Sequence, residues 1–494
     1  MDSLQLGYVT ASIAALVAFL LLRGGNTGIG LRSIPGPPSP SWIFGNLLQL
    51  LAPYQYGDYE FTWQKLYGPL YRVKGCFGED RLIVSDPVAL QSIVNSNKFD
   101  HSPLLNNLHK LIYSKRSLLI VRDGNYRRLR AAFSSSFSAA GVRQYQSAME
   151  SAAEQLTKEL ELSSSTDSID VCPLLTIATL SAISEAVIGC STQELGDEFV
   201  QICSRVVGLA TKSDTASLLM KALGTRLPGW FWSIVSLLPT PTFNELRRGR
   251  DLGMQIGTRI VQEKLRAVHQ GLELGNDAFS RIVASDQWEK TMDAEELAAH
   301  ASLLAIAGQE TTAKTLAFAL LELARNPELQ DSLQKEVHAS RGDQVAYNNM
   351  PLLNAFIKEV LRLYPIVPLE ERIVIEDTVL PVSDKVTSST GAPLGQIPIR
   401  KGQIVSLAIA SYQRAELLWG EDAEEFKPSR WIEGTSYQGD DVGPYANLLT
   451  FFGGPRTCLG WRFAILEMQV IISELVAKFS FQLPEGDSVV TRLL

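Results

Sequence analysis

The spacing of apolar and polar residues predicts a mainly helical chain with a minor share of strand. From about residue 85 to residue 375, apolar positions recur at helical spacing. The longest pattern predicts a helix from about Asp293 to Arg325. Asp293 is its expected N-cap, and Glu295 and Glu296 fall in the first turn, where the helix dipole favours anions. The pattern shows no internal repeat, and residues 42–494 are expected to form one folded body.

Shorter sequence patterns predict further helices and strands within residues 42–494. Residues 71–84 hold β-favouring residues around the turn-like GCFGED, which predicts a hairpin. Asp86-Pro87 predicts an N-cap followed by proline at the first helical position, and Asn326-Pro327 repeats the signal. Residues 382–405 are typical of a strand, a polar loop and a second strand.

The N-terminus begins with an uncharged apolar run over residues 6–22, near the lower length limit for a spanning helix. A cleaved signal peptide is the alternative, but it needs positive residues before the run, and here Asp2 follows Met1. Arg23 and Arg32 follow the run and favour a retained anchor with a cytosolic body. We therefore expect an anchor over residues 1–22 and a stiff proline-rich hinge over residues 23–41.

A second apolar segment, residues 227–241, reads LPGWFWSIVSLLPTP and is too short to span a bilayer. It is either a buried core loop or a surface that dips into the membrane, with Trp230 and Trp232 at the headgroup level. The sequence does not separate the two.

Composition narrows the classes of function. The chain has 494 residues, of which 46% are apolar and 20% charged, and its net charge is −8. This balance gives no overall attraction for nucleic acid, and no Lys/Arg-rich block supplies one. Five cysteines without a C-x-x-C pair indicate reduced thiols rather than a disulfide scaffold.

The most informative cysteine is Cys458, in the loop FFGGPRTCLG at residues 451–460. A metal-bound thiolate needs nearby positive charge or donated hydrogen bonds. Arg456 supplies a cation, and Gly454 and Gly460 allow tight turns that bring N–H groups to the sulfur. Phe451 shields it from water, and the dipole of the helix that follows points at it. The alternative, an inert buried thiol, is assigned to Cys76, Cys172, Cys190 and Cys203.

The Cys458 loop resembles the haem-thiolate loop of the cytochrome P-450 monooxygenases. The resemblance implies the cytochrome P-450 fold after one transmembrane helix, and haem b (iron protoporphyrin IX) held by Cys458, with Phe451 and Arg456 beside it. The text AGQETT in the long helix is similar to the family's oxygen-activating segment. It implies that Ala307 and Gly308 leave room for haem and O2, and that Glu310 and Thr311 deliver protons.

Three further segments extend the resemblance in the expected order. KEVLRLYP and FKPSRW resemble the family's structural Glu-Arg-Arg network, which implies that Glu359, Arg362 and Arg430 hold the loop before the cysteine. GNYRRLRAAFSSSF resembles the helix whose Trp-x-x-x-Arg touches a haem propionate. Arg130 takes the arginine place and Tyr126 takes the tryptophan place. Arg372 resembles the propionate arginine of the next strand.

Helical phase gives expectations for the substrate pocket. Ala301, Leu304 and Ala305 lie one or two turns before Gly308 on a similar face, and Ile366, Val367 and Leu369 follow the Glu-x-x-Arg helix. His300 is expected to be a satisfied structural residue.

The resemblance implies a microsomal monooxygenase, most like fungal (basidiomycete) members. It implies a single-pass protein of the endoplasmic reticulum membrane with a cytosolic catalytic domain. The expected partners are O2, membrane lipid, a lipophilic terpenoid, sterol or aromatic substrate, and an NADPH–cytochrome reductase near Arg127 and Arg128. In this family a terminal hairpin usually follows the cysteine loop, and the short 459–494 segment suggests that it is truncated. The alternatives are a haem-thiolate isomerase or dehydratase, and a non-catalytic haem- or lipid-binding membrane protein.

Overall fold

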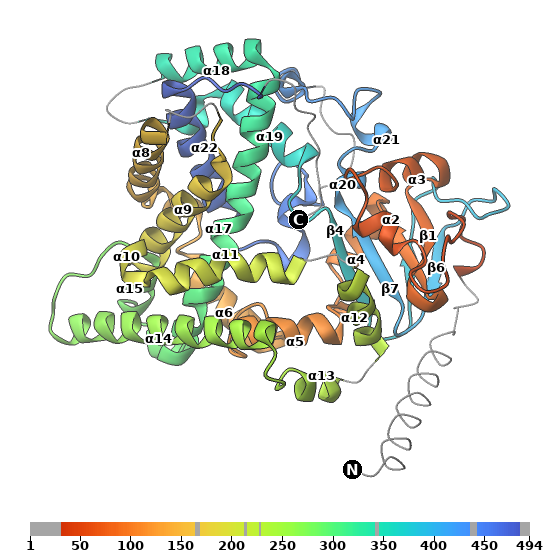
Figure 1. The fold of residues 1–494 in the computed structure, drawn as a ribbon, viewed down its shortest axis with the longest axis horizontal. Coiled ribbons are helices and arrows are strands. Elements are labelled where there is room, and N and C mark those ends of the chain that lie inside the picture. Colours follow the sequence, from red (N-terminus) through yellow and green to blue (C-terminus); the bar gives the residue numbers. More distant parts are fainter. Residues whose placement is uncertain are drawn as a thin grey trace.

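The computed structural model describes residues 31–163, 168–211, 215–226, 229–340, 345–434 and 442–484. Within these ranges the chain is mainly helical with a small β portion, as predicted. Figure 1 shows most helices on one side of the molecule and the sheet on the other. The expected anchor, residues 1–22, lies outside the described residues.

Most of the described chain is helical. The α-helices are α2 (Leu47–Leu51), α3 (Glu60–Tyr67), α4 (Pro87–Val94), α5 (Pro103–Ile112), α6 (Asp123–Ser134), α7 (Ala139–Arg143), α8 (Gln146–Ser163), α9 (Val171–Ile183), α10 (Thr192–Leu195), α11 (Asp197–Thr211), α12 (Thr215–Arg226), α13 (Gly229–Val235), α14 (Pro241–His269), α15 (Ala278–Val283), α16 (Trp288–Thr291), α17 (Ala294–Arg325), α18 (Pro327–Ala339), α19 (Pro351–Leu363), α20 (Ile409–Tyr412), α21 (Glu416–Trp419) and α22 (Trp461–Lys478). A π-helical segment, η3 (Ser184–Ile188), follows α9, and the short 3-10 turns are η2 (Cys76–Gly78), η4 (Tyr347–Asn349), η5 (Pro428–Trp431), η6 (Leu449–Phe451) and η7 (Gly454–Arg456).

The long helix α17 runs through the centre of the helical part, packed between α9 and α14 (Figure 1). Its start matches the prediction. The Asp293 side chain accepts from the backbone N–H of Glu296, and the Glu296 side chain caps back onto Asp293. Helix α22, which begins three residues after Cys458, packs on α8, α17, α18 and α19. The Cys458 loop is thereby tied to the core of the molecule.

The strands form one five-stranded and one two-stranded sheet. They are β1 (Leu70–Lys74), β2 (Asp80–Val84), β3 (Phe99–Asp100), β4 (Leu369–Val374), β5 (Thr378–Pro381), β6 (Gln396–Ile399) and β7 (Ile404–Ala408). The larger sheet has the order β1-β2-β7-β4-β3, and β5 pairs with β6. The antiparallel β1–β2 pair confirms the predicted hairpin, with Leu70 opposite Val84. Strand β4 carries Arg372 towards the Cys458 loop.

Two local predictions need correction. Pro327 is the first residue of α18, but the Asn326 side chain does not cap this helix. Its amide instead donates to the carbonyl of Glu322, 2.8 Å away at the end of α17. The second half of the expected hinge is part of the body, because Leu31 and Ile34 are buried in the core and the Arg72 N–H donates to the Pro35 carbonyl at 2.8 Å.

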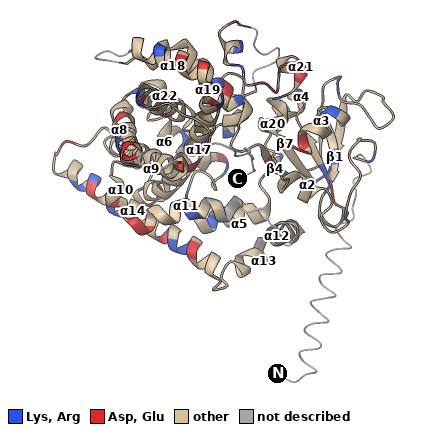
Figure 2. Cartoon of the chain, turned by 45° about the horizontal axis from the view of Figure 1, so that its top comes forward, with Lys and Arg blue, Asp and Glu red and all other residues tan. Residues whose placement is uncertain are grey.

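The 227–241 segment is not a buried core loop. From Gly229 to Val235 it is the helix α13, which carries no charged residue (Figure 2). Trp232 is buried, whereas Trp230 is 65% exposed, and Ile234, Leu237 and Leu238 are also exposed. Among the described helices, one apolar stretch, Val171–Ile188, is long enough to cross a membrane, but 61% of it is buried inside the protein, as in a core helix.

Candidate active site

The backbone of the Cys458 loop is fixed by its own hydrogen bonds and by close packing. The Cys458 N–H donates to the carbonyl of Phe451 at 2.9 Å, and the Thr457 hydroxyl donates to the carbonyl of Gly454 at 2.7 Å. Gly454 has a φ of +63°, and a Cβ there would lie 2.3 Å from the carbonyl oxygen of Val94. Only glycine fits this position. Gly460, by contrast, has a φ of −91° and needs no such freedom.

The Cys458 side chain lies inside the molecule and still has a large accessible surface. Burial raises the pKa of its thiol, while the N–H of Gly460 and the charge of Arg130 act to lower it. A side chain that is surrounded by protein atoms and is still accessible borders a space inside the molecule. The two groups that favour the thiolate, the N–H of Gly460 and the guanidinium of Arg130, therefore lie near the sulfur.

Helix α17 also has accessible positions. Between residues 297 and 324 of this otherwise packed helix, Ala307 and Thr311 are the exposed positions. They lie one turn apart on one face, and the Thr311 hydroxyl donates to the carbonyl of Ala307 at 2.8 Å. Cys458 in its loop and these two positions of α17 are thus accessible although they belong to otherwise packed parts of the protein.

Gly308 has a different use from the one expected. A Cβ at this position would lie 2.7 Å from Cγ1 of Ile183, so the missing side chain lets α9 pack closely against α17. The open positions are Ala307 and Thr311, and Gly308 contributes to helix packing rather than to free volume.

Glu310 faces another side of α17 from Thr311. Its carboxylate forms an ion pair with Lys314, with Oε2 and Nζ 2.9 Å apart, and it is nearly buried. The charge of Glu310 contributes to raising the pKa of Cys203 on α11, although burial is the larger cause. The acid therefore lies towards α9 and α11, whereas Thr311 is on the accessible face of α17. Sequence reasoning missed Lys314, although its i+4 spacing from Glu310 was a usable signal.

The structure brings Glu359, Arg362 and Arg430 together in a buried network, which we call the Glu359 network. Arg362 donates twice to the Glu359 carboxylate, at 2.9 Å from Nε and 2.8 Å from Nη2, and Arg430 Nε donates at 3.0 Å. Burial alone would raise the pKa of Glu359, but the two guanidiniums and the Lys427 N–H hold it below its ordinary value. Trp431, which the sequence did not indicate, donates its indole N–H at 2.9 Å.

The Glu359 network is connected to the Cys458 loop. Arg362 Nη1 donates to the carbonyl of Gln413 at 2.9 Å. The Gln413 side-chain oxygen in turn accepts from the hydroxyl of Thr450, which also donates to the carbonyl of Leu361 at 2.7 Å. Thr450 precedes Phe451, so the network holds the start of the loop.

A second group of arginines, the cationic cluster, contains Arg130, Arg372 and Arg456, the three arginines expected at the haem, and also Arg122. Their charges affect one another: burial lowers the pKa of Arg372 to about 10, opposed by Asp100 and assisted by Arg122 and Arg456. Two carboxylates, Asp100 and Glu370, pair with Arg122 and Arg372. Four guanidiniums thus face two carboxylates, which leaves an excess of two positive charges.

His101 completes the cationic cluster and was also missed from the sequence. Its Nδ1 lies 3.1 Å from Nη1 of Arg372. Burial, followed by the charge of Arg372, lowers the pKa of His101 to about 2, so the ring is neutral. The guanidinium of Arg372 also lies 5.0 Å from the ring centre of Phe452 in the loop, which places the cluster beside Cys458.

Other expected residues are less central. His300 is structural, as predicted: it is buried, and its Nε2 accepts from the N–H of Leu118 at 3.0 Å. Arg128 is committed to an ion pair with Glu296 at 2.6 Å, whereas Arg127 is exposed. Ala301, Leu304 and Ala305 are packed in the core, and Leu369 packs on the sheet cluster around Trp63.

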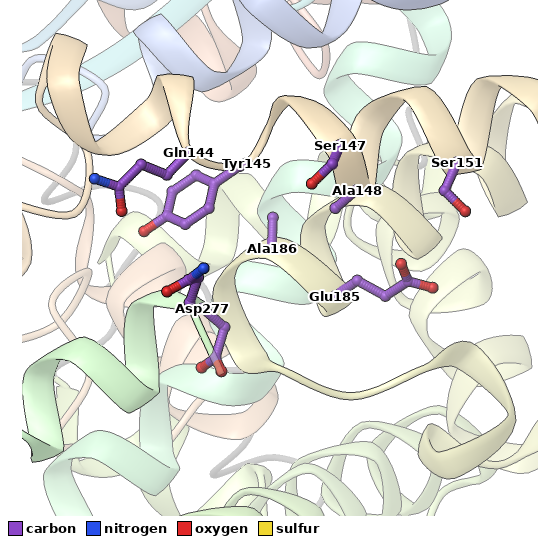
Figure 3. Close-up of a pocket in the computed structure, with 9 residues that line it drawn as sticks. Gln144, Tyr145, Ser147, Ala148, Ser151, Glu185, Ala186 and Asp277 are labelled. Carbon is purple, nitrogen blue, oxygen red and sulfur yellow. The ribbon is translucent and has the colours of Figure 1, made fainter. Parts of the chain in front are cut away.

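The surface also has a cleft of about 330 Å³. It is lined by Gln144, Tyr145, Ser147, Ala148, Ser151, Glu185, Ala186, Asn276 and Asp277 (Figure 3). It contains none of the residues described above and is separate from the site around Cys458.

Comparisons with known proteins agree with the geometry of this site. The family model "Cytochrome P450" matches residues 35–493. The chain is 30% identical to cytochrome P450 monooxygenase claO of Ampulloclitocybe clavipes, over 97% of this chain and 91% of that protein. It is also 30% identical to cytochrome P450 monooxygenase 91 of Postia placenta, over 93% of this chain and 89% of that protein. Both relatives are fungal.

Proposed function

The chain belongs to the cytochrome P450 family, whose members bind haem b through a cysteine thiolate, and we propose that it oxidises a lipophilic substrate with electrons from a separate NADPH–cytochrome reductase. One atom of O2 enters a C–H bond of the substrate as a hydroxyl group. The other leaves as water with two protons, and NADPH supplies the two electrons. The substrate class we propose is a terpenoid, a sterol or an aromatic secondary metabolite.

The observation that carries this proposal is the accessible thiol of Cys458 inside the protein, beside a cluster with two uncompensated positive charges. Haem b fits both features, because it needs one axial thiolate and has two anionic propionates. Cys458 would hold the iron, and Arg130, Arg372 and Arg456 would bind the propionates, assisted by Arg122 and His101. When bound, haem supplies the activation of O2, which the thiolate promotes by donating electron density.

Glu310 and Thr311 are proposed to deliver the protons. Thr311 lies on the accessible face of α17, whereas Glu310 lies on the α9 and α11 side in an ion pair with Lys314. This arrangement suits a carboxylate that collects a proton outside the site and a hydroxyl that delivers it inside. The intact Glu310-Thr311 pair favours oxygenation over the isomerase or dehydratase alternative.

The apolar surface around α13 supports membrane contact. Trp230, Ile234, Leu237 and Leu238 are exposed without a charged residue among them. Helix α12, which precedes α13, packs its Ala222 against Leu47 and Cys76 of the N-terminal part of the body. We propose that this surface and the anchor at residues 1–22 hold the protein on the cytosolic side of the endoplasmic reticulum membrane, where lipophilic substrates dissolve.

Turnover tests the proposal. The purified protein is mixed with reductase, NADPH and isotopically heavy O2, and a panel of terpenoids, sterols and aromatics is searched by mass spectrometry for gain of one heavy oxygen atom. We expect such a product, and we expect that Cys458→Ser abolishes it. Haem binding without NADPH consumption for any substrate would favour the non-catalytic alternative. Product that forms without NADPH would favour an isomerase or dehydratase.

The proton-delivery roles have a matched control on the same helix. We expect Thr311→Ala to lower the product formed per NADPH about tenfold or more, because proton delivery fails while reduction continues. Thr315→Ala removes another hydroxyl of α17, one that donates to the carbonyl of Thr311 at 2.9 Å. It should leave this ratio nearly unchanged. An equal loss in both variants would assign the effect to helix packing.

A further inference from the structure

Tyr126 occupies the place of a tryptophan in the family's pattern, yet its contacts do not imitate an indole. The residue lies on α6, is buried, and stands one turn before Arg130 on the same face. Its hydroxyl donates to the carbonyl of Pro455 at 2.6 Å. Pro455 lies three residues before Cys458, so the side chain joins α6 directly to the loop.

The same side chain also positions two arginines of the cationic cluster. Arg130 Nη1 donates to the Tyr126 hydroxyl at 3.4 Å, while the guanidinium of Arg456 lies 3.8 Å from the centre of the Tyr126 ring. Arg456 is further held by donation from Nη2 to the carbonyl of Val121 at 3.2 Å. Two hydrogen bonds therefore link Arg130, through the Tyr126 hydroxyl, to the Cys458 loop, and Arg456 packs on the Tyr126 ring.

A phenol can fill this position in a way that neither common replacement can. This pair of hydrogen bonds needs one group that donates to the carbonyl of Pro455 and also accepts from Arg130. A hydroxyl does both, an indole N–H donates only, and a phenylalanine ring does neither. The phenol therefore joins Arg130 of the cationic cluster to the loop that carries Cys458.

We propose that Tyr126 is a positioning residue for Cys458, in that its hydroxyl clamps the loop to α6 and links the loop to Arg130. This inference rests on the proposed role of Cys458 as the thiolate ligand. It goes beyond that role because it assigns the stability of the ligated thiolate to a residue that contacts neither the sulfur nor a substrate.

The test measures the stability of the thiolate-ligated form in haem-loaded Tyr126→Phe. This variant keeps the ring and its contact with Arg456 but removes both hydrogen bonds. The readout is the rate at which the reduced, carbon monoxide-bound protein loses its thiolate-type Soret band at a fixed urea concentration. Loss of the hydrogen bond to Pro455 should speed this conversion about three- to tenfold.

Two variants sharpen the result. Tyr145→Phe is the matched control, since Tyr145 is equally buried and packs on Phe463 of α22, but its hydroxyl lies at the cleft of Figure 3 and not at the loop. It should convert at the wild-type rate. Tyr126→Trp keeps a donor but accepts nothing from Arg130, and its rate should fall between those of the wild type and Tyr126→Phe.

An unchanged rate in Tyr126→Phe would overturn the inference. Weaker haem retention with an unchanged conversion rate would do the same, because it would mean that the hydroxyl acts on the cofactor and not on the loop. If the wild-type protein itself gives no thiolate-type band, the proposed function fails. A normal wild-type band with no effect of Tyr126→Phe removes the role of Tyr126 alone.

Discussion

The two groups of arginines in this protein have opposite electrostatic balance. In the Glu359 network, Arg362 and Arg430 surround a fully buried carboxylate, Arg430 also pairs with the carboxylate of Asp422, and other donors meet backbone carbonyls such as that of Gln413. In the cationic cluster, four guanidiniums face two carboxylates, and burial together with neighbouring charge lowers the pKa of Arg372. The first group is satisfied by the chain itself, whereas the second retains positive charge.

The difference separates residues that stabilise the fold from residues that await a ligand. A buried charge with its partners in place makes the structure specific and is costly to break. A partly buried excess of like charge lowers stability until an anion arrives. Substitutions in the two groups should therefore act on different states of the protein, and the following predictions are ordered by the expected size of the effect.

The largest effect is expected from Glu359→Gln. It removes the buried carboxylate that Arg362 and Arg430 share and leaves Arg430 paired with Asp422 alone, which should lower the free energy of unfolding by about 3–5 kcal/mol with or without haem. Urea unfolding followed by circular dichroism measures this loss. Glu328→Gln, at an exposed position on α18, is the control and should stay close to the wild type. Similar stability of the two variants would contradict a structural role for the Glu359 network.

Arg372→Leu should act almost wholly on haem binding. One charge-assisted contact to a propionate is lost, so transfer of haem to a haem-free acceptor protein should become about 10- to 100-fold faster. The haem-free protein should be no less stable than the wild type, since like-charge repulsion falls. If haem-free Arg372→Leu unfolds much more easily while haem transfer is unchanged, the cationic cluster is structural after all.

Substitution of His101 should have a smaller effect on the free energy of unfolding, and this effect depends on pH. Burial and then Arg372 lower the pKa of its ring from 6.5 to about 2 in the folded protein. As the pH falls, the unfolded chain therefore binds a proton before the folded protein does. The neutral ring contributes fully to the free energy of unfolding above pH 6.5, and this contribution is lost as the pH falls towards 2. Between pH 6.5 and 5.5 the loss is about 1 kcal/mol.

His101→Gln should flatten this part of the stability curve of the haem-free protein, as measured by urea unfolding at several pH values. His269→Gln, at the exposed end of α14, should leave the curve unchanged. An identical slope in wild type and His101→Gln would mean that the ring is charged or exposed in the folded state.

The smallest effect is expected from Arg127→Ala, on α6 but outside both groups. Because Arg127 is exposed, neither stability nor haem binding should change. If it contributes to docking of the reductase, the KM for reductase should rise about two- to threefold, and more at low salt. A change in haem retention would show that Arg127 belongs to the cationic cluster.

Signals that are local in the sequence predicted the structure well. The Asp293 N-cap, the Asp86-Pro87 start of α4 and the hairpin near residues 71–84 each depend on a few neighbouring residues, and each is confirmed. Asn326 shows the limit of such signals. Its side-chain amide donates to the carbonyl of Glu322 at the end of α17 and does not cap α18.

Contacts between distant segments could not be predicted in this way. The donors that complete the hydrogen bonding of the Glu359 carboxylate include the Trp431 indole. His101 reaches Arg372 only because β3 pairs with β4. The use of Gly308 was likewise hidden, because the side chain of Ile183 that fills the space comes from another helix. Residue types and motif spacing identified the candidate site, but packing decided which neighbours complete it.

The most direct test of the account is the absorption spectrum of the purified protein after reduction and addition of carbon monoxide, recorded for the wild type and for Cys458→Ser. We expect bound porphyrin and a red-shifted Soret band typical of thiolate ligation in the wild type, and loss of that band in Cys458→Ser. A band typical of histidine ligation in the wild type, or a thiolate-type band that persists in Cys458→Ser, would contradict the assignment of Cys458 as the ligand of the iron.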